Sequence, residues 1–301
     1  MTARAALADR GKIEEQVALA PLTSYKLGGP ARFLVVVDGE EDLLLAAALA
    51  AEEGVGMIAL GRGSNVIVAD RGFPGVVVRP GPGLSRWELA GADEIVAGAG
   101  MPLPMLARES ARAGRGGLEF FTGIPGSVGG AVRMNAGCHG SDTAGWMVAA
   151  RIFDLAGGRA GDRTPADLDM TYRHTNLTDD HFVLSARFRT VDRDPAEAEE
   201  AIREITRWRR EHQPGGTLNA GSVFKNPPGD SAGRIIDAAG LKGLRIGGAE
   251  VSERHANFIV AEEGATASDL HALVTEVRRR VREAVGVDLV PEVRFVGEFG
   301  R

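Results

Sequence analysis

Two glycine-rich segments are the part of this sequence best suited to chemistry. Residues 116–140 read GGLEFFTGIPGSVGGAVRMNAGCHG, and residues 60–66 read LGRGSNV. Glycine allows backbone N–H groups to approach a phosphate closely and to adopt positive φ. The apolar residues spaced through the longer segment predict that it packs on a scaffold. Two anchored loops of this kind predict a bound dinucleotide, and FAD is favoured over NAD.

The shorter loop fits neither of the two common phosphate-binding motifs. It lacks the third glycine of G-x-G-x-x-G, and the following VIVAD predicts a strand where a Rossmann fold needs a helix. No lysine follows a G-x-x-x-x-G frame, as a P-loop requires. Ser64 and Asn65 remain as hydroxyl and amide donors for a pyrophosphate. A plain β-turn between two strands is the alternative interpretation of this loop.

Further motifs extend over most of the chain in a fixed order, and together they carry a family resemblance. They are TSYKLGGPAR (23–32), GRGSNVIVADRGFPGVVV (61–78), GLEFFTGIPGSVGGAVRMNAG (117–137), DMTYRHTN (169–176), QPGGTLNAGSVFKNP (213–227), AGLKGLRIGGAEVSERHANFIV (239–260) and PEVRFVG (291–297). In these motifs and their order the chain resembles the UDP-N-acetylenolpyruvoylglucosamine reductase family. So many motifs in one order make the resemblance specific.

The resemblance implies an α+β fold and a flavin reaction. The fold would be a two-lobed FAD-binding domain of the vanillyl-alcohol oxidase/p-cresol methylhydroxylase type, followed by a C-terminal α/β substrate domain. It implies non-covalent FAD, NADPH as co-substrate, and reduction of UDP-N-acetylglucosamine enolpyruvate to UDP-N-acetylmuramate in peptidoglycan precursor synthesis. Carried over by motif, the FAD contacts are Gly61, Arg62, Gly63, Ser64, Asn65, Val66, Thr122, Gly123, Ile124, Pro125, Gly126, Ser127, Gly130 and Ala131.

The resemblance assigns catalysis to Arg173, Ser222 and Glu292. An arginine offers a permanent charge and a planar fork that fits a carboxylate, and a surface ion pair is the alternative for Arg173. Ser222 would donate a proton to carbon, and a turn serine is its alternative. Glu292 precedes an apolar strand, where burial would raise the pKa of a carboxyl group and let it polarise a developing enolate. Its alternative is a strand-edge carboxylate paired with an arginine.

Substrate contacts are implied for Tyr172, Arg209, His212 and Asn226. Asn226 matches the asparagine that holds the nucleotide sugar in the family. Arg209 and His212 end a predicted helix, where cations also complement the helix dipole without any ligand. The family commonly has lysine at the His212 position, and histidine is only partly charged near neutral pH. Tyr172 would stack on the substrate or pack in the protein. No tyrosine follows Tyr172, so the chain resembles the shorter branch of the family, which lacks an inserted tyrosine loop.

Two other functions are compatible with the glycine loops. A flavin oxidase of small alcohols or sugars would keep the loops without needing the three catalytic residues. A nucleotide-binding regulator or structural protein would keep the scaffold and lose the chemistry. Arg173, Ser222 and Glu292 are all present within their motifs, which favours the reductase over both.

The elements that must position these residues can be predicted in part. A helix is expected over residues 40–53 with Gly54 as its C-cap, and short strands are expected in MIALG, NVIVAD and GVVVRP. Further helices are expected from about 101 to 114, from 194 onward with Asp194 as N-cap, over 230–239 and over 267–285. Strands AARIFDL and FVLSARFRTV flank a turn-rich insert. We expect an FAD domain over 1–192, split near 79–83, and a substrate domain over 193–301 whose final strand returns Glu292 to the flavin.

Composition fits a cytoplasmic enzyme. The chain has 301 residues, a net charge of −6 and one cysteine, Cys138. The acidic balance argues against a nucleic-acid partner, and no apolar run reaches the roughly 20 residues of a membrane span. A single cysteine excludes an internal disulfide and a multi-cysteine metal site. We expect no metal, no export signal, and a monomer.

Overall fold

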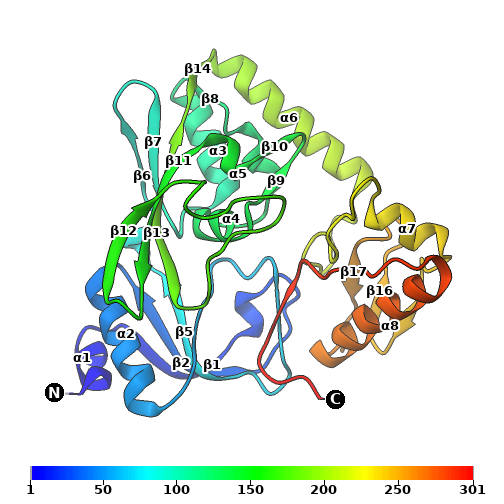
Figure 1. The fold of residues 1–301 in the computed structure, drawn as a ribbon, viewed down its shortest axis with the longest axis horizontal. Helices are drawn as coiled ribbons and strands as arrows, with labels where there is room; N and C mark the ends of the chain where they lie inside the picture. The colour runs from blue at the N-terminus through cyan, green and yellow to red at the C-terminus, as the bar shows by residue number, and fades with distance from the viewer. Residues whose placement is uncertain (1, 301) are drawn as a thin grey trace. The chain divides into compact units, whose positions relative to one another are not determined.

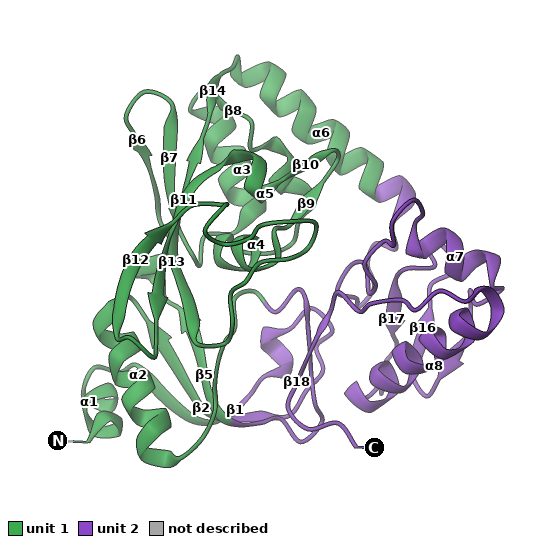
Figure 2. Ribbon diagram, in the orientation of Figure 1, with its two compact units in different colours: residues 1–16, 32–62, 75–209 green, residues 17–31, 63–74, 210–301 purple. Residues whose placement is uncertain are grey.

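The computed structural model describes residues 2–300, which form two compact units. Among the described residues, unit 1 comprises 2–16, 32–62 and 75–209, and unit 2 comprises 17–31, 63–74 and 210–300 (Figure 2). Unit 2 therefore combines the C-terminal part of the chain with two short segments from its N-terminal part. The glycine loop 60–66 changes unit after Arg62.

Most of the first sheet belongs to unit 1, and two helices cover one of its faces. The strand order is β1-β2-β5-β3, with β3 parallel to β5. Successive side chains of β5 alternate between the faces of the sheet, and Val76 and Val78 enter the core that the sheet shares with the helices. The elements are α1 (Ala3–Asp9), β1 (Ile13–Ala18), β2 (Pro30–Val37), α2 (Glu40–Glu53), β3 (Met57–Ala59) and β5 (Phe73–Pro80).

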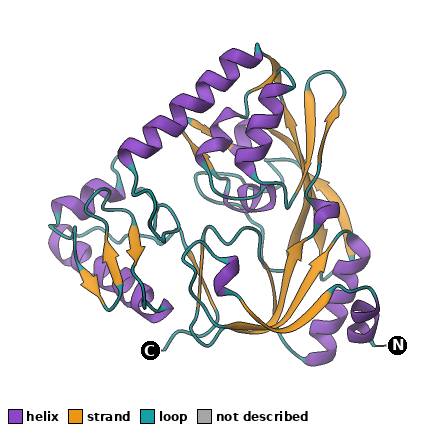
Figure 3. Cartoon of the chain, turned by 180° about the vertical axis from the view of Figure 1, so that it is seen from behind, coloured by secondary structure: helices purple, strands orange, loops and turns teal. Residues whose placement is uncertain are grey.

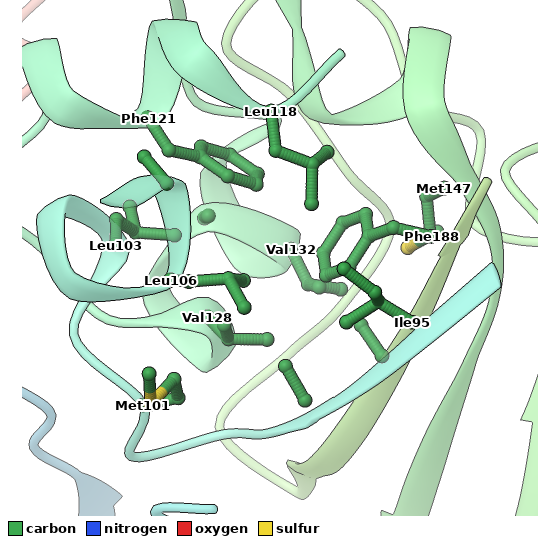
Figure 4. Close-up of a cluster of buried hydrophobic side chains, with 14 of the residues drawn as sticks. Ile95, Met101, Leu103, Leu106, Leu118, Phe121, Val128, Val132, Met147 and Phe188 are labelled. Atoms are coloured by element: carbon green, nitrogen blue, oxygen red, sulfur yellow. The ribbon is translucent and has the colours of Figure 1, made fainter. Parts of the chain in front are cut away.

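The second sheet of unit 1 is antiparallel and packs its inner face on the glycine-rich segment. Its order is β12-β11-β13-β7-β6. Phe121, Val128 and Val132 from the segment meet Ile95 and Phe188 from the sheet in one buried cluster (Figure 4). The strands are β6 (Trp87–Ala90), β7 (Glu94–Gly98), β11 (Met147–Asp154), β12 (Arg159–Arg163) and β13 (His181–Arg189).

Further elements complete unit 1, and the long helix α6 leads out of it. They are α3 (Leu103–Arg112), β8 (Arg115–Gly116), a 3-10 helix (Glu119–Gly123), α4 (Val128–Met134), β9 (Gly137–Cys138), β10 (Ser141–Asp142), α5 (Thr143–Trp146), β14 (Val191–Asp192) and α6 (Pro195–His212). Figure 1 follows their order along the chain by colour, and Figure 3 separates helices from strands. The glycine-rich segment is thus folded into helices and turns with a buried apolar side, as its sequence predicts.

Unit 2 has its own core, built around the longest helix. A three-stranded antiparallel sheet has the order β15-β16-β17. Val251 of β16 packs in this core with Leu273 and Val277 of α8. A separate parallel pair joins β4 to β18, with Arg294 opposite Val66. The elements are β4 (Val66–Val68), α7 (Ala232–Ala238), β15 (Arg245–Ile246), β16 (Ala249–Val251), β17 (Ile259–Ala261), α8 (Ala267–Val285) and β18 (Arg294–Val296).

Asp70 ties the segment 63–74 to the C-terminal part of unit 2. Its carboxylate accepts hydrogen bonds from the main-chain N–H groups of Ala267 at 2.8 Å and Ser268 at 3.0 Å, and from the Ser268 hydroxyl at 2.6 Å. The first N–H groups of a helix have no partner within the helix. A residue 197 positions earlier in the chain therefore satisfies the start of α8.

The predicted helices are confirmed, with small differences at their ends. α2 and α8 have the predicted bounds, and Gly54 ends α2 with φ +65. Asp194 accepts a hydrogen bond from Ala196 N at 2.8 Å at the start of α6. The helix expected from residue 230 begins at Ala232 because Ser231, not Asp230, caps it. The turn-rich insert contains one strand, β12, that the sequence did not indicate.

Within residues 2–300, no helix is both long enough and apolar enough to cross a membrane.

Replacing Asp70 with alanine should destabilise the first turn of α8 by about 1–2 kcal/mol, the usual cost of a lost helix cap. Amide hydrogen exchange of residues 267–270 should accelerate, and the thermal midpoint should fall. Asp93→Ala removes an exposed aspartate in the β6–β7 turn and is the control. Equal exchange in both variants would show that Asp70 contributes nothing to the helix.

Candidate active site

Residues of the two predicted phosphate loops meet inside unit 1. A Cβ atom placed on Gly61 would lie 2.6 Å from Ser127 Oγ, so the loops are in contact only because residue 61 has no side chain. Ser127 is buried, and its hydroxyl makes no hydrogen bond within residues 2–300. A hydroxyl in this position can donate to a bound anion beside the bare backbone of Gly61.

Thr122 gives a direct sign that a polar ligand fits here. Its Oγ1 atom is buried and has no hydrogen-bond partner among the described residues. Leaving a buried hydroxyl unsatisfied costs about 1–3 kcal/mol. The residue lies in the 3-10 helix Glu119–Gly123, inside the segment predicted to contact FAD. A ligand oxygen or nitrogen would satisfy this atom, so the residues present fit a flavin dinucleotide.

The second half of the shorter loop has a different structural basis. Gly63 has φ +63, and a Cβ there would collide with the Leu22 carbonyl oxygen. Glycine is therefore required at 63 by the chain itself, whether or not a phosphate approaches. Asn65 Nδ2 donates to the Glu292 carbonyl oxygen at 2.9 Å, and Arg294 N donates to the Asn65 carbonyl at 3.0 Å. The loop is thus bonded to the segment that carries Glu292 and leads into β18.

Arg173 is held by main-chain carbonyls in unit 1. Its Nη2 donates to Gly137 O at 2.5 Å, its Nη1 approaches Asn135 O at 3.4 Å, and its guanidinium carbon lies 5.1 Å from the centre of the Tyr172 ring. Its own backbone adopts φ +53, which is uncommon for a residue with a side chain. Strained backbone of this kind persists where surrounding structure fixes it, often at functional sites.

Asn135 holds the turn that carries Arg173. It is 2% exposed and ends α4 in the left-handed region, with φ +41. Its Nδ2 donates to Thr171 O at 2.9 Å, and its Oδ1 accepts from Ala144 N at 2.9 Å. Its carbonyl also faces Arg173 Nη1. One buried side chain therefore fixes the turn from which Arg173 projects.

Ser222 lies in unit 2, on an extended segment held by a buried asparagine. Asn257 Oδ1 accepts from Phe224 N at 2.9 Å, and Asn257 Nδ2 donates to Phe224 O at 2.8 Å. Val223 N donates to the Asn257 carbonyl at 2.8 Å. The Ser222 hydroxyl makes no hydrogen bond within residues 2–300, so it can donate to a ligand.

Glu292 is brought next to the Ser222 segment by main-chain pairing. Glu292 N donates to Val223 O at 2.7 Å, and Pro291 forms an antiparallel bridge with Phe224. Ser222 and Glu292 therefore sit on adjacent extended segments of unit 2, one residue out of register. The same Glu292 main chain accepts the Asn65 hydrogen bond.

The helix α6 places Arg209 and His212 near its end. Arg209 lies beside Cys138, and burial lowers the pKa of its guanidinium. Arg254 donates to the carbonyls of Arg210 and Glu211, the latter at 2.9 Å. A cation from another segment therefore already satisfies carbonyls of the last turn, which weakens the helix-capping explanation for His212.

Cys138 is a packed thiol. Its Sγ donates to Phe120 O at 3.1 Å, and burial raises its pKa to about 11. A thiol with this pKa stays protonated and unreactive near neutral pH.

Two further predicted residues have clear local roles. Asn226 Oδ1 accepts from Ala232 N at 3.0 Å, at the first residue of α7. Tyr172 is 52% exposed, and its ring lies against the Arg173 guanidinium.

Three positioning residues were absent from the sequence predictions. Asn135, Asn257 and Arg254 all lie within motifs that carry the family resemblance. An asparagine directly before Ala-Gly, where a helix stops, indicates a left-handed C-cap. Nothing local indicates that Asn257 or Arg254 reaches across to another segment.

The comparisons with known proteins agree with this geometry. Residues 31–159 match the family described as FAD binding domain, and residues 213–296 match the family described as UDP-N-acetylenolpyruvoylglucosamine reductase, C-terminal domain. With the mixed helices and strands of the fold, these matches define a flavoprotein with an FAD-binding domain of the predicted type and an additional C-terminal domain.

Relatives over the full length are more specific. The chain is 47% identical over 278 residues to UDP-N-acetylenolpyruvoylglucosamine reductase of Rubrobacter xylanophilus, covering 92% of each chain. It is 42% identical over 296 residues to the reductase of Caulobacter sp., covering 96% of each. The crystal structure of the reductase from Thermus caldophilus aligns with a TM-score of 0.82 and 38% identity, over 95% of this chain and 99% of that one. The chain belongs to the UDP-N-acetylenolpyruvoylglucosamine reductase family.

Replacing Gly61 with alanine should lower flavin affinity by about 10-fold or more, because the new methyl group would displace the Ser127 hydroxyl and fill the approach to the backbone. The flavin-to-protein absorbance ratio of the purified protein measures this. Gly161→Ala is the matched control, since no atom lies within 4 Å of a Cβ there. Full flavin content in the Gly61 variant would remove this contact from the phosphate site.

Proposed function

We propose that this chain reduces UDP-N-acetylglucosamine enolpyruvate to UDP-N-acetylmuramate with FAD and NADPH, in peptidoglycan precursor synthesis. One observation carries the assignment of the catalytic residues. The pairing of β18 with β4 places Ser222, Glu292 and the second half of the flavin loop in one compact unit. This pairing continues the segment that carries Glu292, so the flavin loop and the candidate acid are held by the same stretch of main chain.

Bound FAD would supply hydride transfer from NADPH to the enolpyruvyl carbon. Gly61, Thr122 and Ser127 would hold the cofactor, together with Ser64 and the main chain of the shorter loop. We assign the remaining predicted FAD contacts, including Arg62, Gly123, Ile124, Pro125, Gly126, Gly130 and Ala131, to the same cradle. Val66 begins β4 and anchors the cradle to β18.

Arg173 would bind the substrate carboxylate. Negative charge grows there when hydride reaches the neighbouring carbon, and a prearranged cation stabilises such charge without reorganising. The Gly137 and Asn135 carbonyls hold the guanidinium in place.

Ser222 would donate the proton that completes the reduction. Its hydroxyl is not engaged within the described residues, and Gly221, with φ +77, sets its direction. Glu292 on the adjacent segment would polarise the developing enolate and assist the serine. The segments that carry both residues are held together by a main-chain hydrogen bond from Glu292 N to Val223 O.

Tyr172, Arg209, His212 and Asn226 would bind the nucleotide sugar. Arg209 and His212 would meet the diphosphate, Asn226 the sugar, and Tyr172 would stack on the substrate. We further propose a substrate less enclosed than in relatives with a tyrosine loop, a cytoplasmic monomer that binds no nucleic acid, and the domain division at residues 192 and 193.

Ser222→Ala tests both the activity and the assignment. The purified protein should be yellow, NADPH should bleach it, and the enolpyruvyl substrate should restore the colour. In Ser222→Ala the bleaching should proceed at nearly the native rate, whereas colour recovery should slow by about 10²–10⁴-fold, the range for a lost general acid. Rapid-mixing absorbance at the flavin band separates the two steps. Ser222→Cys should recover part of the loss, since a thiol can donate a proton.

A wild-type protein that NADPH bleaches but the enolpyruvyl substrate cannot recolour would reject the function. An alanine variant equally slow in both steps would make Ser222 a residue that only shapes the site.

Asn135→Gly should slow colour recovery by about 10–100-fold, because the turn that projects Arg173 loses its anchor while glycine still accepts φ +41. Flavin content and bleaching by NADPH should stay near native. In an Arg173→Ala background the same substitution should have little further effect, and this double-mutant cycle distinguishes positioning from general damage. An undiminished effect without Arg173 would contradict the assignment.

A further inference from the structure

Arg79 lies at the carboxyl end of β5, next to the start of the flavin loop. β3 and β5 are parallel, with Ala59 opposite Val78, and Leu60 N donates to Val78 O at 2.8 Å. Continuing this register by one residue sets Leu60 beside Arg79, immediately before Gly61 and Arg62. Ligands of open sheets with parallel strands bind beyond the carboxyl ends of those strands.

The side chain of Arg79 leaves the core. Val76 and Val78 enter the hydrophobic cluster beneath the sheet. Successive side chains of a strand alternate between its faces, so Arg79 projects from the other face. No carboxylate forms an ion pair with Arg79 or Arg62 within residues 2–300.

Burial of the Arg79 guanidinium therefore costs free energy that no contact among the described residues offsets. Its Nε atom is buried without a hydrogen-bond partner among the described residues. Burial lowers the pKa of the guanidinium, and the positive charge of Arg62 lowers it further. Comparable arginines in unit 1 have acidic partners, as Arg193 has Glu119 at 3.0 Å. A desolvated donor next to a second cation is retained where an anion completes it.

We propose that Arg62 and Arg79 form a clamp for a nucleoside diphosphate. Two guanidinium groups match the two charges of a diphosphate, and guanidinium N–H donors pair with phosphate oxygens bidentately. The inference rests on the proposed function, in which cofactor and substrate both carry a diphosphate. It adds a charged residue from β5 to a site otherwise made of loop backbone and hydroxyl groups. Gly61 beside Ser127 provides the open backbone adjoining Arg62.

The decisive experiment compares Arg79→Met, Arg79→Lys and a control, Arg112→Met, which removes an exposed arginine on α3. The FAD dissociation constant is measured by diluting the holoenzyme and following the fluorescence of released flavin at several salt concentrations. Arg79→Met should weaken binding by about 10–100-fold and flatten its salt dependence. Arg79→Lys should lose less, because it keeps the charge, and Arg112→Met should match the wild type.

A second measurement follows the stability of the flavin-free protein, which Arg79→Met should not lower even though it weakens flavin binding. Flavin-free protein is prepared from the holoenzyme and verified by its recovery of FAD. Its thermal midpoint should be unchanged or a few degrees higher in Arg79→Met, because the variant no longer buries an uncompensated charge. A residue with a purely structural role would instead lower the midpoint of the flavin-free protein.

Competing ligands distinguish whether the clamp binds the diphosphate of FAD or that of the UDP substrate. ADP should compete with FAD in the wild type and less in Arg79→Met if the cofactor occupies the clamp. If FAD affinity is unchanged, the KM for the UDP substrate and competition by UDP should change instead. Unchanged values for both would overturn the clamp, as would weaker binding accompanied by a destabilised flavin-free protein. Neither result would affect the proposed reaction, because bleaching and recolouring of the flavin test that reaction independently.

Discussion

The parallel pairing of β18 with β4 is the interaction on which the site depends. Through it, the main chain around Glu292 is bonded both to the flavin loop, by Asn65, and to the Ser222 segment, by Val223. These are backbone and buried-amide hydrogen bonds, whose geometry is narrow. The main chain of the acid and of the serine is therefore positioned by the same hydrogen bonds that close the loop.

Asparagine recurs where this protein must fix a reactive residue. Asn65, Asn135 and Asn257 each use a side-chain amide to hold main chain belonging to another segment. An amide offers both donors and an acceptor without a net charge. Carboxylates in these places would attract the substrate-binding arginines and repel an anionic substrate. Uncharged anchors leave the electrostatic field of the site to Arg173 and the phosphate-binding residues.

The sequence predicts a helix or strand well where the residues that define its ends are close together in the chain. The bounds of α2, α6 and α8 are predicted closely. Their end signals, which are the caps of α2 and α8 and the proline at the start of α6, each lie within one helical turn of the helix end. β12 was missed because its five residues are mostly polar and exposed, and the pairing with β11 defines it. The candidate catalytic residues came from the family resemblance. The anchors of those residues could not be predicted, because each depends on contacts between distant segments, such as Asn65 with Glu292.

The bond between Asn65 and Glu292 joins residues 227 positions apart, and this separation has a consequence for synthesis of the protein. Contacts between distant residues form late, because the intervening chain must first be ordered. While a ribosome is still extending the chain, β4 has no β18 to pair with, and its main-chain groups remain an open edge. Assembly of the cofactor loop therefore waits for the last part of the chain to emerge, and incomplete translation products would expose that edge to other chains.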